Sequence, residues 1–542
     1  MYTTPILPKR PQDPSELQEV GTNTLRIIRP DLSSEALFVP TSEERDVRKR
    51  RVARCLRGYD GVMVLGDAAC YAALKTHDAR FDGQFFVGVS STRIYCRPVC
   101  TVRTPKREHC SFYPSAAAAE RHGFRPCLRC RPELAPGYAS VDASRRLAQA
   151  AAGCIDDGAL TDSSLAALAD RLGVTDRHLR RVFEAEFGVS PVDYAQTQRL
   201  LLAKRLLTDT TFPVTEVAMA AGFGSLRRFN TMFRERYRLT PTDVRATPEA
   251  APQSTLSFDL AYRPPFAWDA HLAFLSGRAI DGVEAVSARA YRRAVSIRTG
   301  DTTHRGWVMV LPSRRRHALR ATLSGSLARV VPHVLARVKR VFDLSCRPDE
   351  VSAHLGSLAA SAPGLRVPGA FDGFEMAVRA ILGQQITVRA ARTLAGRVAS
   401  VLGDPVETPF ADVSRVFPDA ARIAAVASDE LGRLGVLSSR VGAIQVLARA
   451  CASGAIVLEP GVDVERTIDA LLAIPGIGAW TAQYIAMRAL AWPDAFPHTD
   501  YGVKKALGQS SPARVLAHAE AWRPWRAYAT LHLWRSLEKE TP

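Results

Sequence analysis

Four cysteines in two close pairs constrain the fold of this chain more than any other feature of its sequence. Cys96 and Cys100 are separated by three residues, and Cys127 and Cys130, separated by two, follow after 26 intervening residues. Four thiolates at this spacing form a soft tetrahedral sulfur site, for which zinc is the usual metal. The chain must then fold so that two short turns meet at one ion.

The sequence around these cysteines resembles the N-terminal domain of the Ada family of adaptive-response proteins. The resemblance rests on residues 81–86, 95–100, 111–113 and 123–130. It implies that all four cysteines hold one Zn²⁺ and that Cys96 accepts a methyl group from a methylated DNA phosphate. A thiol bound to zinc loses its proton, so this chemistry is reasonable. The residues themselves leave two alternatives open, namely a purely structural zinc ribbon and a ligand supplied by Cys110 beside His109.

Apolar residues at helical spacing repeat twice between residues 140 and 246, each time with a glycine turn before a helix. Thr175 or Asp176 can cap the first such helix, and Ser225 can cap the second. The pattern resembles the tandem helix-turn-helix domain of the AraC family. That resemblance implies two recognition helices and one joining helix, at about 176–186, 225–236 and 191–207.

Basic and polar side chains on the expected recognition helices are candidates for contacts with DNA bases or phosphates. Each of them alone is more simply a solvated surface charge, and the tandem unit as a whole favours DNA binding. The candidates are Arg177, His178, Arg180, Arg181, Arg227, Arg228 and Asn230.

A Pro-Gly-Ile-Gly turn lies between two apolar helical segments in residues 472–484. Gly476 and Gly478 permit a tight turn, and the amides that open the next helix at Gly478 and Ala479 suit a phosphate oxygen. An ordinary turn between helices is the alternative. Trp480 and Tyr484 lie four residues apart on one helical face, and a carboxylate follows at Asp500. Together these features indicate an enzyme that holds DNA and acts on a flipped base.

From about Ser257 to the C-terminus the chain resembles the helix-hairpin-helix DNA glycosylases of the AlkA type, which are DNA-3-methyladenine glycosylases II. The matching stretches are 262–268, 379–386, 475–482 and 524–528. The resemblance implies that Asp500 is the catalytic carboxylate, whereas nearby Asp494 is interpreted as a solvated loop acid. Trp480 stands where strand-cleaving relatives carry a lysine, so we expect base excision without strand cleavage.

The same resemblance assigns the base pocket and the residue that fills the gap in the base stack. Gln385 takes the place of an intercalating leucine in this family. The residues assigned to the base pocket or its edge are Phe274, Trp480, Tyr484, Tyr501 and Trp534.

The expected architecture is multidomain and mainly α-helical. A small α+β zinc domain precedes an all-α tandem helix-turn-helix domain, a small α+β sheet domain and an all-α helix-hairpin-helix glycosylase domain. The expected boundaries are a basic, disordered extension at 1–62, the zinc domain at 63–135, the DNA-binding domain at 140–246, a linker at 247–256, the sheet domain at 257–335 and the glycosylase domain at 336–542.

A formal net charge of +18 favours a polyanionic partner. We expect double-stranded DNA, both alkylated DNA and promoter sites, together with RNA polymerase. No apolar run is long enough to cross a membrane, so we expect the protein in the bacterial cytoplasm. We also expect a monomer, which associates with the nucleoid when it is bound to DNA.

Two functions compete. The first is an alkylation-damage response protein that joins a methyl-phosphotriester-sensing transcriptional regulator to a glycosylase. The second is a DNA-binding transcription factor with structural zinc and an inactive glycosylase-like module. The presence of Asp500 with the aromatic set favours the first.

Overall fold

The computed structural model describes four stretches of the chain. The extension predicted at 1–62 and most of the linker predicted at 247–256 lie outside the described residues. The described stretches are 66–135, 146–245, 255–313 and 316–539.

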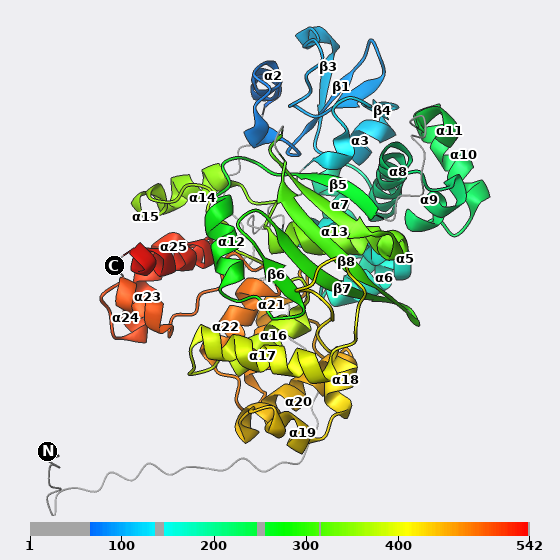
Figure 1. The fold of residues 1–542 in the computed structure, drawn as a ribbon. Helices are drawn as coiled ribbons and strands as arrows, with labels where there is room; N and C mark the ends of the chain where they lie inside the picture. Colours follow the sequence, from blue (N-terminus) through cyan, green and yellow to red (C-terminus); the bar gives the residue numbers. More distant parts are fainter. Residues whose placement is uncertain (1–65, 136–145, 246–254, 314–315, 540–542) are drawn as a thin grey trace, which may run out of the picture. The chain divides into compact units, whose positions relative to one another are not determined.

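A four-stranded sheet in the order β3-β1-β2-β4 carries the four cysteines (Figure 1). β1 pairs antiparallel with both β2 and β3, whereas β2 pairs in parallel with the short β4, which brings Ile94 opposite Arg125. Both cysteine pairs therefore emerge from neighbouring strands. The elements are α2 (Asp67–Lys75), η1 (Ala79–Phe81), β1 (Phe86–Val89), β2 (Ile94–Cys96), η2 (Arg107–His109), β3 (Cys110–Tyr113), α3 (Ala116–Arg121), β4 (Arg125–Pro126) and η3 (Pro132–Leu134).

The next segment is all-helical and contains both predicted helix-turn-helix units. The two predicted caps form, because Thr175 accepts a hydrogen bond from the His178 amide and Ser225 accepts one from the Arg228 amide. The helices are α4 (Arg146–Asp156), α5 (Ala159–Asp162), α6 (Leu165–Arg171), α7 (Asp176–Phe187), α8 (Pro191–Asp209), α9 (Val214–Ala220), α10 (Leu226–Tyr237) and α11 (Pro241–Val244).

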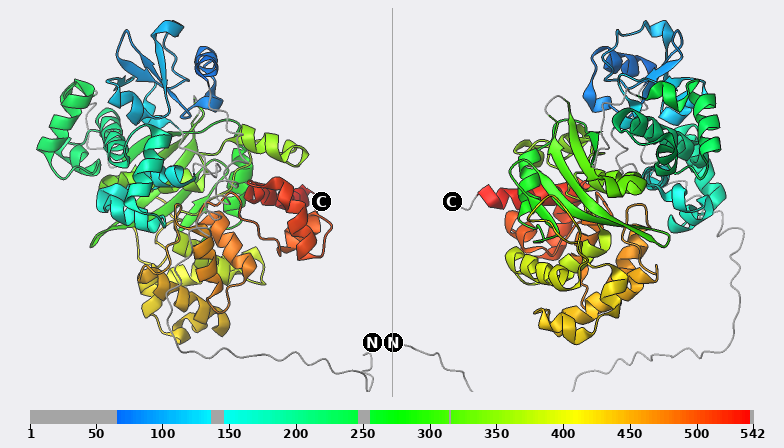
Figure 2. Two further views of the ribbon diagram at one scale, coloured as in Figure 1. Left: turned by 180° about the vertical axis from the view of Figure 1, so that it is seen from behind. Right: turned by 45° about the vertical axis from the view of Figure 1, so that its right-hand side comes forward.

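A twisted five-stranded antiparallel sheet follows, in the order β5-β9-β8-β7-β6. The right-hand view of Figure 2 shows the twist of these strands in green. The sequence predicted a small sheet in this part of the chain, and β5 and β6 form the two edges of the observed sheet. The elements are β5 (Thr255–Ala261), α12 (Trp268–Ser276), β6 (Glu284–Val286), β7 (Tyr291–Thr299), β8 (Thr302–Pro312), β9 (Ala318–Ser324), η4 (Gly325–Val330) and α13 (Val331–Val341).

Helices form the rest of the chain around a large apolar core, which confirms the mainly α-helical prediction. The core gathers residues from α14, α16, α17, α20, α21, α22 and α25, so the hairpin between α21 and α22 has rigid support on its inner side. These elements are α14 (Pro348–Leu355), α15 (Ser357–Ala360), α16 (Gly373–Leu382), α17 (Val388–Leu402), α18 (Ala420–Ala425), α19 (Ser428–Arg433), α20 (Ser438–Ala452), α21 (Val464–Leu472), α22 (Ala479–Arg488), α23 (Tyr501–Ala506), α24 (Pro512–Ala519), η5 (Glu520–Trp522) and α25 (Arg526–Lys539).

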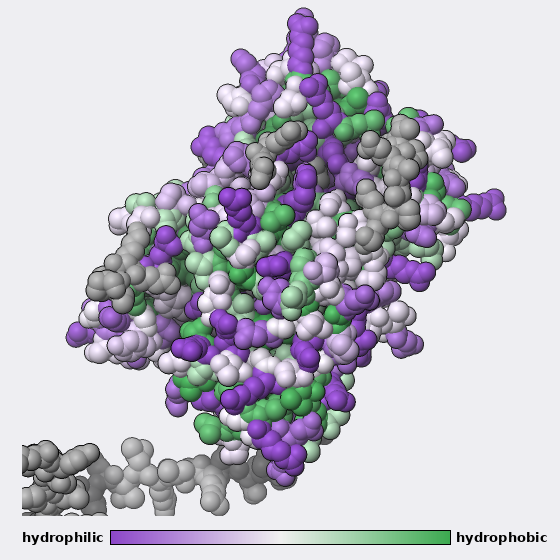
Figure 3. Space-filling model, in the orientation of Figure 1, coloured by the Kyte–Doolittle hydropathy of each residue, from purple (hydrophilic) through white to green (hydrophobic). Residues whose placement is uncertain are grey.

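Within the described residues, no helix is both long enough and apolar enough to cross a bilayer. Figure 3 shows hydrophilic and hydrophobic side chains mixed over the visible face.

A buried network of charges connects the five-stranded sheet to α16. Arg293 on β7 donates to the Glu375 carboxylate at 2.5 Å, and Arg379 donates to Glu284 on β6 at 2.8 Å. Arg293, Glu284 and Glu375 are each less than a tenth exposed. Because buried charges are costly unless they are paired, this network fixes α16 against the sheet.

We expect Glu375→Ala to lower the free energy of unfolding by about 3–5 kcal/mol, because it leaves the Arg293 guanidinium buried without this partner. All seven tryptophans lie between residues 268 and 534, so urea unfolding followed by tryptophan fluorescence reports on this part of the chain. Asp404→Ala is the matched control. It removes an exposed ion pair with Arg305 and should cost less than about 1 kcal/mol. Equal losses in the two variants would contradict the structural role of the buried network.

Candidate active site and metal centre

The four cysteines of the predicted metal site converge. The sulfur atoms of Cys96, Cys100, Cys127 and Cys130 all lie within 4.8 Å of one another. Three of these residues are buried and Cys130 is partly exposed. Hydrogen bonding to the Cys100 thiol raises the pKa of Cys96. Four thiolates this close repel one another and are stable together only around a cation. Donor type, number and proximity fit one tetrahedral Zn²⁺, which confirms the predicted cofactor.

Cys110 and His109 do not join this cluster, although the sequence left them open as ligands. The buried Cys110 thiol donates to the Lys106 carbonyl at 3.4 Å, and its side chain packs with Cys70 and Phe85 in a separate apolar cluster. His109 lies at the end of η2 and makes an exposed contact with Glu108.

A buried arginine holds the second cysteine turn in place. The Arg97 side chain pairs with Asp82 and donates to the Cys130 carbonyl at 3.1 Å, while its backbone N–H points at the Cys130 sulfur at 3.4 Å. Sequence reasoning missed this residue, although it directly follows Cys96.

The glycine turn between α21 and α22 has the predicted hairpin geometry. Gly476 has φ +92°, and a Cβ added there would lie 3.3 Å from the Ala443 Cβ. Gly478 is the N-cap of α22 and its helix start has no side-chain cap. The first amides of α22, beginning at Ala479, therefore face outward for a partner such as a phosphate.

Three N–H groups hold the carboxylate of Asp500. The Trp480 indole N–H donates to Oδ2 at 2.7 Å, and the Trp534 indole N–H donates to Oδ1 at 2.9 Å. Oδ1 also accepts the Val503 amide at 2.9 Å, so Asp500 is the N-cap of α23. The carboxylate is thereby fixed in direction at the wall of a cavity.

This cavity has a volume of about 280 Å³, and Asp500, Trp480, Tyr484 and Trp534 line it. The rings of Trp480 and Tyr484 stack, with centroids 5.1 Å apart and planes 10° apart. Three elements that are distant in sequence, α22, α23 and α25, thus contribute to one site.

Guanidinium groups share the cavity with these rings, a feature the sequence interpretation did not include. Arg278, Arg379 and Arg488 line it. Burial alone would raise the pKa of Tyr484, but the nearby guanidiniums, Arg488 first, outweigh burial and lower it. Helical spacing could have revealed two of them, because Arg278 and Arg488 each lie four residues after a predicted pocket residue.

Two predicted pocket residues lie elsewhere. Tyr501 is 78% exposed and does not line the cavity, because it starts α23 on the outer side of its cap Asp500. Phe274 is half-buried behind the cavity wall, where it stacks with Trp534 and carries the Arg278 guanidinium 3.7 Å from its ring centroid. The prediction that both residues line the base pocket is therefore corrected, because neither one lines the cavity.

The interpretation of Asp494 as a solvated acid is wrong. Asp494 is 3% exposed and accepts hydrogen bonds from Arg526 at 2.7 Å and from Arg523 at 2.8 Å. Its role is to anchor the loop that leads to Asp500.

The candidate DNA contacts of the helix-turn-helix units lie on α7 and α10. Arg181, Arg227 and Arg228 are exposed, and Asn230 is partly exposed. Arg180 is also exposed and pairs with Asp176 one turn earlier at 3.0 Å. Gln385 is exposed in the loop between α16 and α17, with φ +56°.

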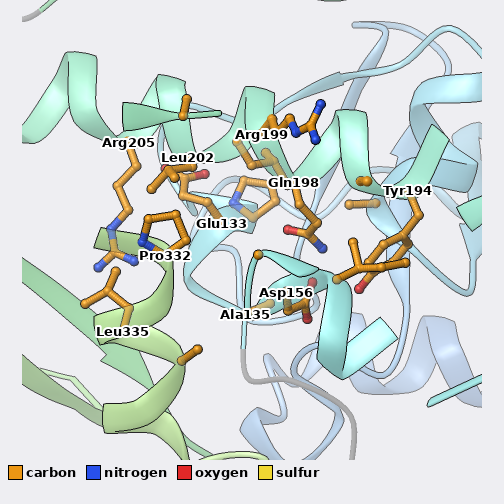
Figure 4. Close-up of a pocket in the computed structure, with 18 of the residues that line it drawn as sticks. Glu133, Ala135, Asp156, Tyr194, Gln198, Arg199, Leu202, Arg205, Pro332 and Leu335 are labelled. Carbon is orange, nitrogen blue, oxygen red and sulfur yellow. The ribbon is translucent and has the colours of Figure 1, made fainter. Parts of the chain in front are cut away.

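A second cavity, of about 130 Å³, holds none of the predicted site residues (Figure 4). Residues from α4, α8 and α13 line it, among them Asp156, Arg205 and Leu335. Burial raises the pKa of Asp156 to about 7 and lowers that of Arg205 to about 10.

Three family models match consecutive parts of the chain. The metal-binding domain of Ada matches residues 69–133, a helix-turn-helix domain matches 168–247, and the AlkA N-terminal domain matches 257–372.

Curated relatives match the same parts of the chain. A probable bifunctional transcriptional activator/DNA repair enzyme AlkA from Mycobacterium tuberculosis is 38% identical over 485 residues, which are 86% of this chain and 96% of the relative. DNA-3-methyladenine glycosylase 2 of Escherichia coli is 39% identical over 51% of this chain and 96% of its own. The bifunctional transcriptional activator/DNA repair enzyme AdaA of Bacillus subtilis is 32% identical over 32% of this chain and 81% of its own.

We expect the purified protein to hold one zinc ion, and Cys127→Ser or Cys130→Ser to lose it and loosen the sheet β1–β4, because metal binding and folding are coupled at such sites. Metal analysis and circular dichroism measure both effects. Cys110→Ser is the matched control, since it changes a buried cysteine outside the cluster and should keep the metal. Full zinc content in both ligand variants would rule out this ligand set.

Proposed function

The chain belongs to the family of bifunctional transcriptional activator/DNA repair enzymes of the AlkA type, and from this premise we propose that Asp500 carries its glycosylase chemistry and Cys96 its methyl-acceptor chemistry. The protein is an alkylation-damage response protein. It joins a methyl-phosphotriester-sensing, DNA-binding regulator to a DNA N-glycosylase that excises alkylated purines such as 3-methyladenine.

The observation that carries the proposal for Asp500 is its set of donors. Two indole N–H groups and one amide hold the carboxylate without neutralising it, at the wall of a cavity of about 280 Å³. When an alkylated purine enters this cavity, the sugar to which it is still attached lies near Asp500. The carboxylate then stabilises the positive charge that grows on the sugar as the bond to the base breaks.

The guanidinium groups that line the cavity add positive charge to the negative charge of Asp500. An N-alkylated purine is cationic while it is attached and neutral once it has left. Arg278 and Arg488 repel the attached cation and tolerate the neutral product, while Asp500 attracts the charge that moves to the sugar. The charge of Arg379 is already compensated by Glu284 and Glu375. Interactions that grow during a reaction lower its barrier, so this polarity favours excision.

The hairpin and the loop that carries Gln385 deliver the base. We propose that the amides at Gly478 and Ala479, with the Gly476 turn, grip a phosphate and that Gln385 fills the gap left in the base stack. Trp480 bonds to Asp500 and leaves no amine at that position, which supports excision without strand cleavage.

In the N-terminal part, a bound Zn²⁺ would keep the four cysteines deprotonated and so make a good methyl acceptor. The Cys96 sulfur would attack the methyl carbon of a phosphotriester. One S–C bond forms, one C–O bond breaks, and the phosphate recovers its negative charge. Candidate contacts of the same part with promoter DNA are Arg180, Arg181, Arg227, Arg228 and Asn230.

DNA is the partner supported by the helix-turn-helix match and by the DNA repair enzymes among the relatives. We further propose RNA polymerase as a partner at promoters, a monomeric state, and the cytoplasm with its nucleoid as the location. We propose the domain boundaries expected from the sequence, except that β5 begins at Thr255 and α13 runs across the boundary at 335.

We expect Asp500→Asn to lower the rate of base release by ~10²–10³-fold or more, because it removes a preorganised charge at the reacting sugar. Affinity for DNA should change little, since the hairpin amides and basic surface remain. Release of 3-methyladenine from alkylated DNA measures the first effect, and a binding titration measures the second. Release at the wild-type rate would show that Asp500 is not catalytic. No release by the wild type would favour the inactive-module alternative.

We expect methylation of Cys96 to strengthen promoter binding about tenfold, because a charge of −2 on four thiolates and Zn²⁺ falls to −1 near the phosphates. Affinity for a promoter duplex should be measured before and after treatment with a methylating agent, with mass spectrometry to confirm the modified cysteine. Cys96→Ala is the control and should not respond. Equal affinities of treated and untreated wild type, with a methyl group confirmed on Cys96, would contradict this electrostatic effect.

A further inference from the structure

One side chain connects the loop of Gln385 to the hairpin. The Gln384 amide nitrogen donates one hydrogen to the Gly476 carbonyl at 2.8 Å and the other to the Thr481 hydroxyl at 2.9 Å. Gly476 forms the turn, and Thr481 lies in the first turn of α22 and is 2% exposed. The amide nitrogen must face this way, because a carbonyl can only accept a hydrogen bond.

The backbone of Gln384 is held from another direction. Arg440 on α20 is 8% exposed and donates to the carbonyls of Gln384 and Leu382. The same helix supports the hairpin, since a Cβ at Gly476 would lie 3.6 Å from the Ser439 carbonyl. The loop, the hairpin and α20 therefore form one unit with Gln384 at its centre.

Gln385, the next residue, depends on this unit. Its φ of +56° lies in the left-handed region, which is unfavourable for a residue with a side chain and persists only where surrounding contacts impose it. The neighbouring carbonyl bonds from Arg440 and the side-chain bonds of Gln384 supply those contacts.

We propose that Gln384 is a positioning residue that fixes the distance and direction between the phosphate grip of the hairpin and the wedge residue Gln385, so that gripping the backbone also aims the wedge at the base stack. The proposal rests on the proposed roles of the hairpin and of Gln385. Gln384 itself touches neither the base nor the sugar. Without it the hairpin still grips DNA, but the wedge is no longer held in register with the gripped phosphate.

The test uses two DNA duplexes that differ only in the free energy needed to flip the damaged base out of the helix. Each carries one N7-methylguanine, paired with cytosine in the first and placed in a one-nucleotide bulge in the second. Extruding an unpaired base costs less, so its excision depends less on an aimed wedge. We expect Gln384→Leu to slow single-turnover excision from the paired site by ~10–100-fold, since small misplacements have such effects. The bulged site should stay within about threefold of wild type.

The matched control is Gln445→Leu. Gln445 is another largely buried amide of the same helical region, and it donates to the Val426 carbonyl at 2.8 Å and accepts from Ser428 at 2.8 Å. Its loss loosens a loop away from the hairpin and should affect both duplexes equally. A second variant, Thr481→Val, removes only one of the two bonds of Gln384 and should give a smaller loss confined to the paired site.

Two results would overturn the proposal. One is excision by Gln384→Leu at the wild-type rate on the paired duplex. The other is an equal loss on both duplexes, as expected for Gln445→Leu, which would make Gln384 merely structural. If Gln384→Leu does not fold, Thr481→Val decides between the same outcomes.

A flipping measurement separates this proposal from the proposed function. Fluorescence of 2-aminopurine placed beside the lesion rises when the stack opens and requires no chemistry, so it is measured in the Asp500→Asn background. We expect Gln384→Leu to lower the signal at saturating protein, and an unchanged signal would refute the positioning role. If wild type opens the stack but releases no base, the glycosylase assignment fails while the positioning role stands.

Discussion

The carboxylate of Asp500 is the point at which the catalytic part of the molecule is assembled. Its two oxygens accept indole N–H groups from Trp480 on α22 and Trp534 on α25, as well as the amide of Val503 on α23. The same two residues line the cavity. Each tryptophan therefore serves twice, since its N–H group orients the acid and its ring helps to shape the cavity. A change at one ring alters both the cavity and the carboxylate.

The cavity is not simply an electron-rich cage for a cation. The Arg278 guanidinium lies 3.7 Å from the centroid of the Phe274 ring, and the Arg488 guanidinium lies 4.9 Å from the same centroid. Arg488 also donates a hydrogen bond to the Tyr484 hydroxyl at 2.7 Å. Cation–π attraction on Phe274 is thus satisfied within the protein. The cavity wall therefore combines aromatic rings and the Asp500 carboxylate with the positive charge of Arg278 and Arg488. This polarity suits a group that loses its charge when it leaves.

Residues that act through local spacing could be predicted from the sequence. The cysteine pairs, the caps Thr175 and Ser225, and the glycine hairpin all lie where the pattern placed them, because turns and caps depend on a few adjacent residues. The failures involve distant partners. Asp494 was misread because its guanidinium partners lie about 30 residues away, and the bonds of Gln384 to the hairpin span more than 90 residues. Tyr501 was misplaced because a resemblance transfers a role but not the exposure of a side chain.

Three functional loops share one means of support. Arg97 donates to the Cys130 carbonyl, Arg440 to the Gln384 carbonyl, and Arg526 to the Asp494 carbonyl, so each loop is bound through its backbone by a largely buried guanidinium. Loops cannot satisfy their own carbonyls as helices do, and a buried carbonyl needs a donor.

A guanidinium suits this task because it stays charged and presents five donors in a rigid plane, so one side chain can fix a loop carbonyl and a second acceptor together. At Arg97 and Arg526 the second acceptor is a carboxylate, and at Arg440 it is another carbonyl, that of Leu382. A lysine offers a single flexible ammonium and would hold one acceptor well and the other poorly. The precision of the metal turn, the wedge loop and the loop before Asp500 therefore depends on three arginines, of which Arg97 and Arg526 lie within stretches that carry the family resemblances.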